Sequence, residues 1–332
     1  MAIDQRVMEI ADKAAEGTTP SREDVLHLLS FDEYSVEASY VCAIARQMAT
    51  KAGKGLGLIH AQIGVDAYPC PENCRFCTFA AINYDADKGY SFDSAPEVPL
   101  EHIAAIAKTF DEEGAHLISL MATAGLPFER YLEMVRATRA AVSPEMLIMV
   151  NAADMTLEEA KALKDAGAQV AYHARRVLEG ELTDIEPALR EQTIANIHEV
   201  GLALMTGVEP LWEGIDPEEL ADRIMEIPAF KPYCTGACTL SPAKDTEMEH
   251  EIPSSTSKVR YVAAIVRLVC GYDVPFGGVG GAIWVDAGAD PRGRGYEPDH
   301  AYLRSLVHRA RRTLTRDGWD VPAHLDPSFL TR

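Results

Sequence analysis

Short apolar runs alternate with amphipathic segments along most of the chain. Strand-like runs such as 58–68, 116–123 and 146–154 are each followed by a stretch in which apolar positions recur every three or four residues. The alternation continues to about residue 317, and no low-complexity linker interrupts it. Six or seven successive βα units with short connections predict a parallel sheet with right-handed crossovers.

The length of this repeating part distinguishes two parallel architectures. A closed (β/α)8 barrel of the TIM type needs about 250 residues, and segment 58–317 provides that length. We therefore predict an α/β protein with a (β/α)8 TIM-type barrel, and a doubly wound sheet is the alternative. The weak point for closure is segment 274–289, where two strands follow each other with no helical pattern between them.

The first part of the chain has a different pattern. Residues 4–54 are typical of helices, and Ser21 followed by Asp24 predicts a helix start with an Asp variant of the capping box. We predict three parts, which are an N-terminal helical extension (1–57), the barrel (58–295) and a C-terminal helix and tail (296–332).

Composition narrows the range of partners and locations. The chain has 31 Lys and Arg against 51 Asp and Glu, a net charge of −20. Nucleic acid and anionic membranes attract clustered positive charge, so we expect neither as the main partner. No apolar stretch approaches the roughly 20 residues that span a bilayer, and the acidic N-terminal segment does not resemble a secretory signal. Seven cysteines, three of them in one loop, argue against a disulfide framework and predict a cytoplasmic protein.

The most specific motif is "YPCPENCRFCTFA", which places Cys70, Cys74 and Cys77 directly after the first predicted strand. In a parallel barrel, loops at the carboxyl ends of the strands build the active site. Thiolates gathered in one loop select zinc or an iron–sulfur cluster. A structural zinc site usually takes four ligands, and the sequence has no second CxxC pair. A [4Fe–4S] cluster held by three thiolates keeps one iron open for a cofactor.

With Phe76 just before its last cysteine, this motif resembles the signature of the radical S-adenosylmethionine (radical SAM) superfamily. A helical prelude before a barrel resembles its biotin synthase-like branch, with methylornithine synthase and hydrogenase-maturation relatives. The resemblance implies that Cys70, Cys74 and Cys77 hold a [4Fe–4S] cluster whose open iron binds SAM. An electron from the reduced cluster then cleaves SAM to a 5′-deoxyadenosyl radical, which abstracts hydrogen from a small-molecule substrate.

The resemblance also assigns residues to SAM. Segment 121–125, "MATAG", takes the place of a Gly-Gly-Glu-like segment but has no carboxylate, so the Thr123 hydroxyl and the backbone at Ala124 would meet the amino group of SAM. Arg190 matches an arginine that binds the SAM carboxylate, a role that suits a guanidinium fork; the alternative is an exposed helix arginine. The other assigned positions are Phe76, His173, Gly207 and Val208, and for Phe76 and His173 a role in core packing is the alternative.

Other residues are candidates for substrate contacts because of where they fall. They follow the third and fourth predicted strands or lie in the glycine-rich segment near residue 290, at the carboxyl edge of the expected barrel. These candidates are Asn151, Asp154, Arg175, Arg176, Asp286 and Arg292.

Cys234 and Cys238 lie four apart in a predicted strand, so both side chains share one face. They would bind an auxiliary cluster, form a redox pair or contact substrate, or be two small core residues. Cys42 and Cys270 fall on apolar helical faces and indicate packing.

We expect a radical SAM enzyme for rearrangement or fragmentation in cofactor or amino-acid biosynthesis, with a flavodoxin or ferredoxin as electron donor. Sulfur insertion, as in biotin or lipoyl synthases, is an alternative that the fifth strand disfavours, because 202–210 has no cysteine for a second cluster. A non-catalytic metal-binding module is an alternative of a different class, and it would need neither a barrel nor an open iron.

Overall fold

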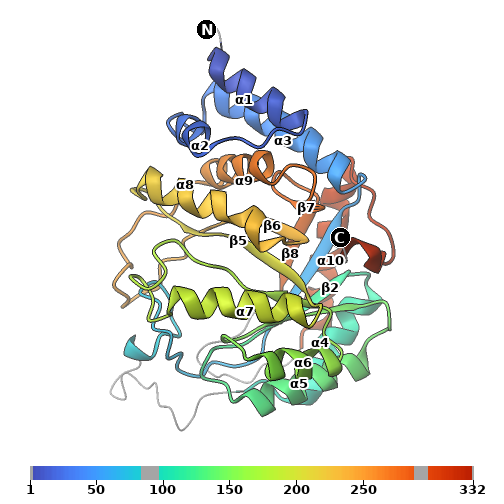
Figure 1. Cartoon of the computed structure of the whole chain (residues 1–332). Helices are drawn as coiled ribbons and strands as arrows, with labels where there is room; N and C mark the ends of the chain where they lie inside the picture. The colour runs from blue at the N-terminus through green and yellow to red at the C-terminus, as the bar shows by residue number, and fades with distance from the viewer. Residues whose placement is uncertain (1–2, 84–96, 288–297, 331–332) are drawn as a thin grey trace.

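The chain folds into a nearly closed barrel of parallel strands. The structure is a computed structural model, and it describes residues 3–83, 97–287 and 298–330. Its eight-stranded sheet has the order β7-β6-β5-β4-β3-β2-β1-β8, so β1 lies between β2 and β8 (Figure 1). The strands are β1 (Leu58–Gly64), β2 (Leu117–Met121), β3 (Leu147–Asn151), β4 (Val170–Tyr172), β5 (Ala203–Leu211), β6 (Cys234–Thr239), β7 (Phe276–Gly277) and β8 (Ala282–Asp286).

This strand order confirms the predicted (β/α)8 TIM-type architecture. The order runs in one direction from β1 to β7, whereas a doubly wound sheet reverses direction at its middle. The alternative is therefore wrong.

Helices surround the barrel and separate its strands along the chain. Within the described residues, each strand from β1 to β6 is followed by an α-helix, and β8 is followed by the last one. None of the helices described is long and apolar enough to cross a membrane. These helices are α4 (Leu100–Glu112), α5 (Phe128–Ala141), α6 (Leu157–Asp165), α7 (Pro187–Glu199), α8 (Pro217–Glu226), α9 (Thr256–Cys270) and α10 (His300–Arg316), with short 3-10 turns η1 (Ala81–Asn83), η4 (Ile227–Phe230) and η5 (Pro327–Leu330).

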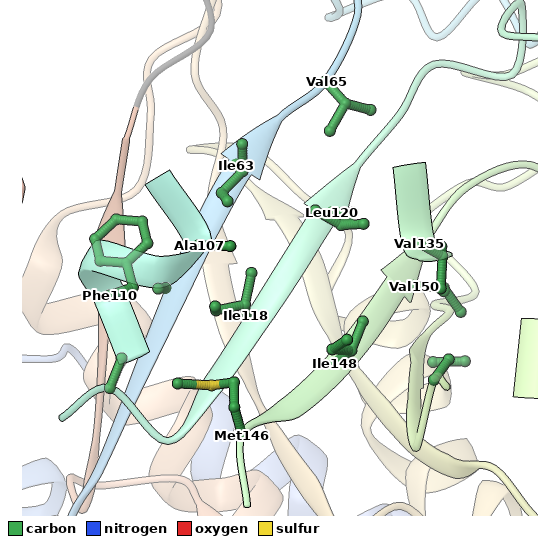
Figure 2. Packing of buried hydrophobic residues seen from close by; sticks show 14 of the residues in the cluster. Ile63, Val65, Ala107, Phe110, Ile118, Leu120, Val135, Met146, Ile148 and Val150 are labelled. Atoms are coloured by element: carbon green, nitrogen blue, oxygen red, sulfur yellow. The ribbon is translucent and has the colours of Figure 1, made fainter. Parts of the chain in front are cut away.

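Alternation along the strands separates an outer core from the barrel interior. Ile63, Ile118 and Ile148 point outward and pack with Phe110 of α4 and Val135 of α5 in one buried cluster (Figure 2). Because successive side chains point to opposite faces, the residues between them face the interior. The near-continuous apolar sequence of these strands follows from burial on both faces.

The amino ends of the strands are closed by an apolar layer, which we call the lumen floor. It contains inward-facing first residues of several strands together with side chains from the C-terminal segment. The interior is therefore filled at this end, and a ligand would enter from the carboxyl ends. The lumen floor includes Leu58, Leu117, Leu147, Val170, Cys234, Phe276, Leu325 and Phe329.

The seam of the barrel lies between β7 and β8, as the sequence predicts. They are the two ends of the sheet order, and only the segment 278–281 connects them. Gly277 has φ +93°, and a Cβ there would lie 1.6 Å from the Thr235 carbonyl oxygen. Only glycine permits so close an approach of β7 to β6.

The N-terminal extension packs against one side of the barrel. Its helices α1 (Gln5–Ala15), α2 (Arg22–Leu29) and α3 (Val36–Ala52) lie over α8 and α9 and share one buried apolar cluster with them (Figure 1). The predicted capping box is confirmed, since Ser21 accepts from the Asp24 amide and Asp24 accepts from the Ser21 amide. The three-part division stays a prediction, and its boundary at 295/296 lies outside the described residues.

Candidate functional site

The three cysteines lie in the loop that follows β1, at the carboxyl end of the barrel. The loop folds back on itself, because the Cys70 amide donates to the Phe79 carbonyl at 2.6 Å and the Cys77 amide donates to the Cys74 carbonyl at 2.9 Å. Cys70 and Cys74 are buried. Local hydrogen bonds thus hold the three thiols on one short, turned segment.

Distant parts of the chain fix the position of this loop. The Arg75 amide donates to the Leu182 carbonyl, the Asp184 amide to the Glu72 carbonyl, both at 2.8 Å, and the Met248 amide to the Arg75 carbonyl at 3.2 Å. The Arg75 side chain also bonds Asp184 at 2.8 Å. The cysteine loop is therefore held by the β4–α7 and β6–α9 connections.

The thiols would have to lose their protons to hold a metal ion or a cluster. Burial raises the pKa of Cys70 to about 11 and that of Cys74 to about 12, so ligation must displace their protons. Among the described residues, no group of three His, Cys, Asp or Glu side chains converges on one point as a single metal ion requires. A cubane spreads its ligands more widely, because each thiolate binds a different iron.

Segment 121–125 lies against the cysteine loop, but Thr123 is already engaged. Its amide and hydroxyl donate to the Asp66 carboxylate at 2.9 and 2.6 Å, and the Gly125 amide donates to its oxygen at 3.2 Å. The predicted SAM contact through the Thr123 hydroxyl is therefore not supported by its hydrogen bonds. The Ala124 backbone lies near the Cys70 sulfur, and a Cβ on Gly125 would lie 2.3 Å from the Pro69 carbonyl oxygen. Small residues here allow the two segments to touch.

Arg190, in the first turn of α7, is buried rather than exposed on its helix, with 3% of its surface accessible. Its Nε and Nη2 atoms have no hydrogen-bond partner among the residues that the structure describes. Glu72 and Glu179 lie 3.5 and 3.8 Å from these atoms, close enough for attraction but too far for a hydrogen bond. Two unmet parallel donors beside the cysteine loop fit the carboxylate of a cofactor.

His173 directly follows β4 and contacts the Arg190 guanidinium. Its Nε2 is 2.6 Å from Asp154 Oδ1 and 2.7 Å from Arg190 Nη1. Burial, reinforced by the charge of Arg190, lowers the pKa of His173 to about 4, so the ring is neutral. These contacts favour the alternative of a satisfied core histidine, and with Asp154 it orients the guanidinium.

A second polar group lies on β4, β5 and the segment after β4. Arg176 Nε is 3.7 Å from Glu209 Oε1, and Tyr172 lies close to the same carboxylate. Arg176 Nη1 has no hydrogen-bond partner within residues 3–83, 97–287 and 298–330. Burial raises the pKa of Tyr172 well above its usual value, so the phenol stays protonated. These groups, and Asn151 at the end of β3, stand where a substrate would lie above the lumen floor.

The remaining predicted positions differ in what they offer. Gly207 faces Gly236 of β6, where a Cβ would meet a carbonyl oxygen at 3.2 Å. The Val208 side chain is buried in the apolar cluster that the N-terminal helices share with α8 and α9, so only its backbone is available to a ligand. Phe76 is half-buried in the cysteine loop. Asp286 ends β8, and Arg292 lies outside the described residues.

The other cysteines do not form a second cluster motif. Cys234 is buried in the lumen floor and Cys238 is exposed, both on β6. Residues four apart in a strand are separated by about 13 Å, too far for the predicted redox pair to close a disulfide. Cys42 and Cys270 pack in the apolar cluster that the N-terminal helices share with α8 and α9, as predicted.

Arg175, another substrate candidate, pairs with Glu226 of α8 at 3.1 Å.

Of the three carboxylates that surround Arg190, the sequence analysis named Asp154, as a candidate for a substrate contact, but neither Glu72 nor Glu179. Glu72 lies inside the cysteine motif, and its position between two ligands was the one available signal. Asp66 and Glu179 have no such signal in the sequence, because only tertiary folding brings Asp66 to Thr123 and Glu179 to Arg190.

Sequence comparisons point to one group of proteins. No model of a known protein family matches the chain. It is 25% identical over 207 residues to the biotin synthase of Desulforudis audaxviator (strain MP104C), covering 60% of this chain and 61% of that protein. It is 28% identical over 210 residues to the biotin synthase of Anaeromyxobacter sp. (strain Fw109-5), covering 60% and 55%. The matches thus span less than two thirds of these relatives.

Solved structures share the fold over nearly the whole chain. The crystal structure of methylornithine synthase (PylB) has a TM-score of 0.74 at 18% identity and covers 94% of this chain and 97% of its own. The structure of HydG, a maturase of the [FeFe]-hydrogenase, has a TM-score of 0.73 at 16% identity, with 96% and 76% covered. These likenesses show a common barrel.

Proposed function

We propose that this chain, a biotin synthase-like member of the radical SAM superfamily, is an enzyme that generates a radical from SAM for use on a small-molecule substrate. The observation that carries the proposal is a three-thiol loop at the carboxyl end of a barrel, beside a buried arginine fork with unmet donors. A plain metal-binding module would need neither feature.

Cys70, Cys74 and Cys77 would hold the [4Fe–4S] cluster, and Arg190 the SAM carboxylate. When bound and reduced, the cluster supplies the electron that cleaves SAM to a 5′-deoxyadenosyl radical. Asp154 and His173 hold the Arg190 guanidinium on one side, so its Nε and Nη2 edge stays directed at the ligand. The barrel wall keeps water from the reacting groups.

We favour rearrangement or fragmentation of the substrate over sulfur insertion, in the biosynthesis of a cofactor or an amino acid. Sulfur insertion needs a second sulfur-bearing cluster, and the two β6 cysteines are about 13 Å apart. Arg176, Glu209, Tyr172 and Asn151 would contact the substrate. The enzyme would act in the cytoplasm and receive electrons from a flavodoxin or ferredoxin.

Anaerobic reconstitution with iron, sulfide and SAM tests the proposal. We expect about four irons per chain and 5′-deoxyadenosine after addition of dithionite. Cys70→Ala, Cys74→Ala and Cys77→Ala should each lose the product, whereas Cys42→Ala, a matched change in the outer core, should keep it. Zinc as the bound metal, or 5′-deoxyadenosine production undiminished in Cys74→Ala, would contradict the proposal.

A further inference from the structure

The inner part of the barrel contains polar side chains that the proposed chemistry does not use. His60 is the inward residue after Leu58 on β1, and Ser119 is the inward residue after Leu117 on β2. Both are therefore one pleat above the lumen floor. Their Cα atoms are roughly 8 Å apart, given the strand register and spacing.

Neither side chain has a hydrogen-bond partner in the described part of the chain. His60 exposes 1% of its surface, yet both of its ring nitrogens lack a hydrogen-bond partner. Ser119 is fully buried, and its hydroxyl also lacks one. Buried polar atoms in native proteins are almost always satisfied, so three unmet positions on adjacent strands point to a group that binds there.

Trp284 of β8 forms the side of this site. It is the register partner of His60, and their rings meet edge to face with centroids 4.5 Å apart. Trp284 nonetheless exposes 39% of its surface. A flat apolar ring that is accessible beside two unmet polar groups suits a ligand with a polar end on a carbon body.

The two polar side chains of the site are uncharged. Burial, with a smaller effect of His116, lowers the pKa of His60 to about 3, so the imidazole is neutral and offers one donor and one acceptor. The Ser119 hydroxyl also offers both. An ionised group would meet only a neutral ring and a hydroxyl in these two residues, whereas a hydroxyl, amide or ketone would form hydrogen bonds with both.

We propose that His60, Ser119 and Trp284 form the inner end of the substrate site and bind an uncharged hydrogen-bonding group of the substrate. That the ligand is a substrate rests on the proposed function; that a ligand binds here does not. The charged groups Arg176 and Glu209 would then meet the opposite end of the same molecule.

The test uses reconstituted holoprotein with SAM, labelled with 15N-histidine, and acetamide as the probe. Acetamide should shift the ring nitrogen resonances of His60, which are assigned by their loss in His60→Gln, whereas acetate and ethylammonium should not. Ser119→Ala should weaken acetamide binding at least fivefold, and Ser305→Ala on the surface of α10 should not. In these variants, acetamide binding is measured by NMR saturation transfer from the protein. His60→Leu should abolish the transfer, because leucine forms no hydrogen bond, and His60→Gln should retain part of it.

Equal shifts with acetate, no shift with acetamide, or unchanged binding in Ser119→Ala would overturn the inference. Release of 5′-deoxyadenosine is measured on the same samples. Product without acetamide binding refutes the inference alone, and acetamide binding without product refutes the proposed function while leaving a polar binding site.

Discussion

Arg190 extends from the first turn of α7 to the cysteine loop. Asp154 and His173 contact one side of its guanidinium, and Glu72 and Glu179 lie 3.5 and 3.8 Å from the other side, so its position is fixed from both sides. A fixed guanidinium fork loses little conformational freedom when it binds a carboxylate, whereas a flexible lysine side chain loses more.

Replacing Arg190 by Lys should therefore weaken SAM binding by about 10- to 100-fold, the equivalent of one or two charge-assisted hydrogen bonds. Equilibrium binding to the reconstituted protein measures this, with iron content as a check that the cluster remains. Arg309→Lys on the exposed face of α10 is the matched control and should bind SAM normally. Equal affinities would show that another residue holds the carboxylate.

The residue scale also shows where prediction from sequence stops. The sequence predicts the three-cysteine site because Cys70, Cys74 and Cys77 lie within eight positions of one another. The SAM contact of Thr123 stays a prediction, and its bond to Asp66 could not be predicted because the two residues are 57 positions apart. His60 was read only as part of a buried strand, since nothing local shows which face of a strand lacks partners.

At the scale of elements, the pattern of apolar positions predicted the strands and helices closely. The capping signal of Ser21 and Asp24 is local, so it was confirmed where predicted. The seam between β7 and β8 is different, because its geometry depends on contacts of α9. Arg267 of α9 is fully buried and donates to the carbonyls of Gly271, Val274 and Gly277.

Arg267→Met should lower the free energy of unfolding by about 3 kcal/mol, because three carbonyls would lose a buried donor at about 1 kcal/mol each. Urea unfolding of the purified protein measures the change. Arg260→Met, on the exposed face of the same helix, should have little effect. A comparable loss in both variants would mean that helix propensity, not the seam, is responsible.

At the scale of the whole molecule, buried histidines link stability to pH. Burial lowers the pKa of His60 to about 3 and those of His116 and His173 to about 4. In the unfolded chain each returns to about 6.5. At pH values between these pKa values, the unfolded state binds more protons than the folded state. The free energy of unfolding therefore falls as the pH drops from about 6.5 towards 4.

Near pH 5 the three rings together should give a slope of about 4 kcal/mol per pH unit. His116→Gln removes one of them and should reduce the slope by about 1.4 kcal/mol per pH unit. Urea unfolding of the metal-free protein between pH 5 and 7 measures both. The surface variant His308→Gln should keep the full slope, and an unchanged slope in His116→Gln would show that its ring is already protonated in the fold.

The anchoring of the cysteine loop has a consequence for how the protein matures. A nascent chain that has emerged only to residue 150 contains all three ligand thiols, but not Leu182, Asp184 or Met248, whose backbone groups fix the loop. The loop therefore reaches its final position only when the second half of the barrel has been synthesised and packed. We expect a cluster bound by these thiols to be inserted after this folding step and not before it.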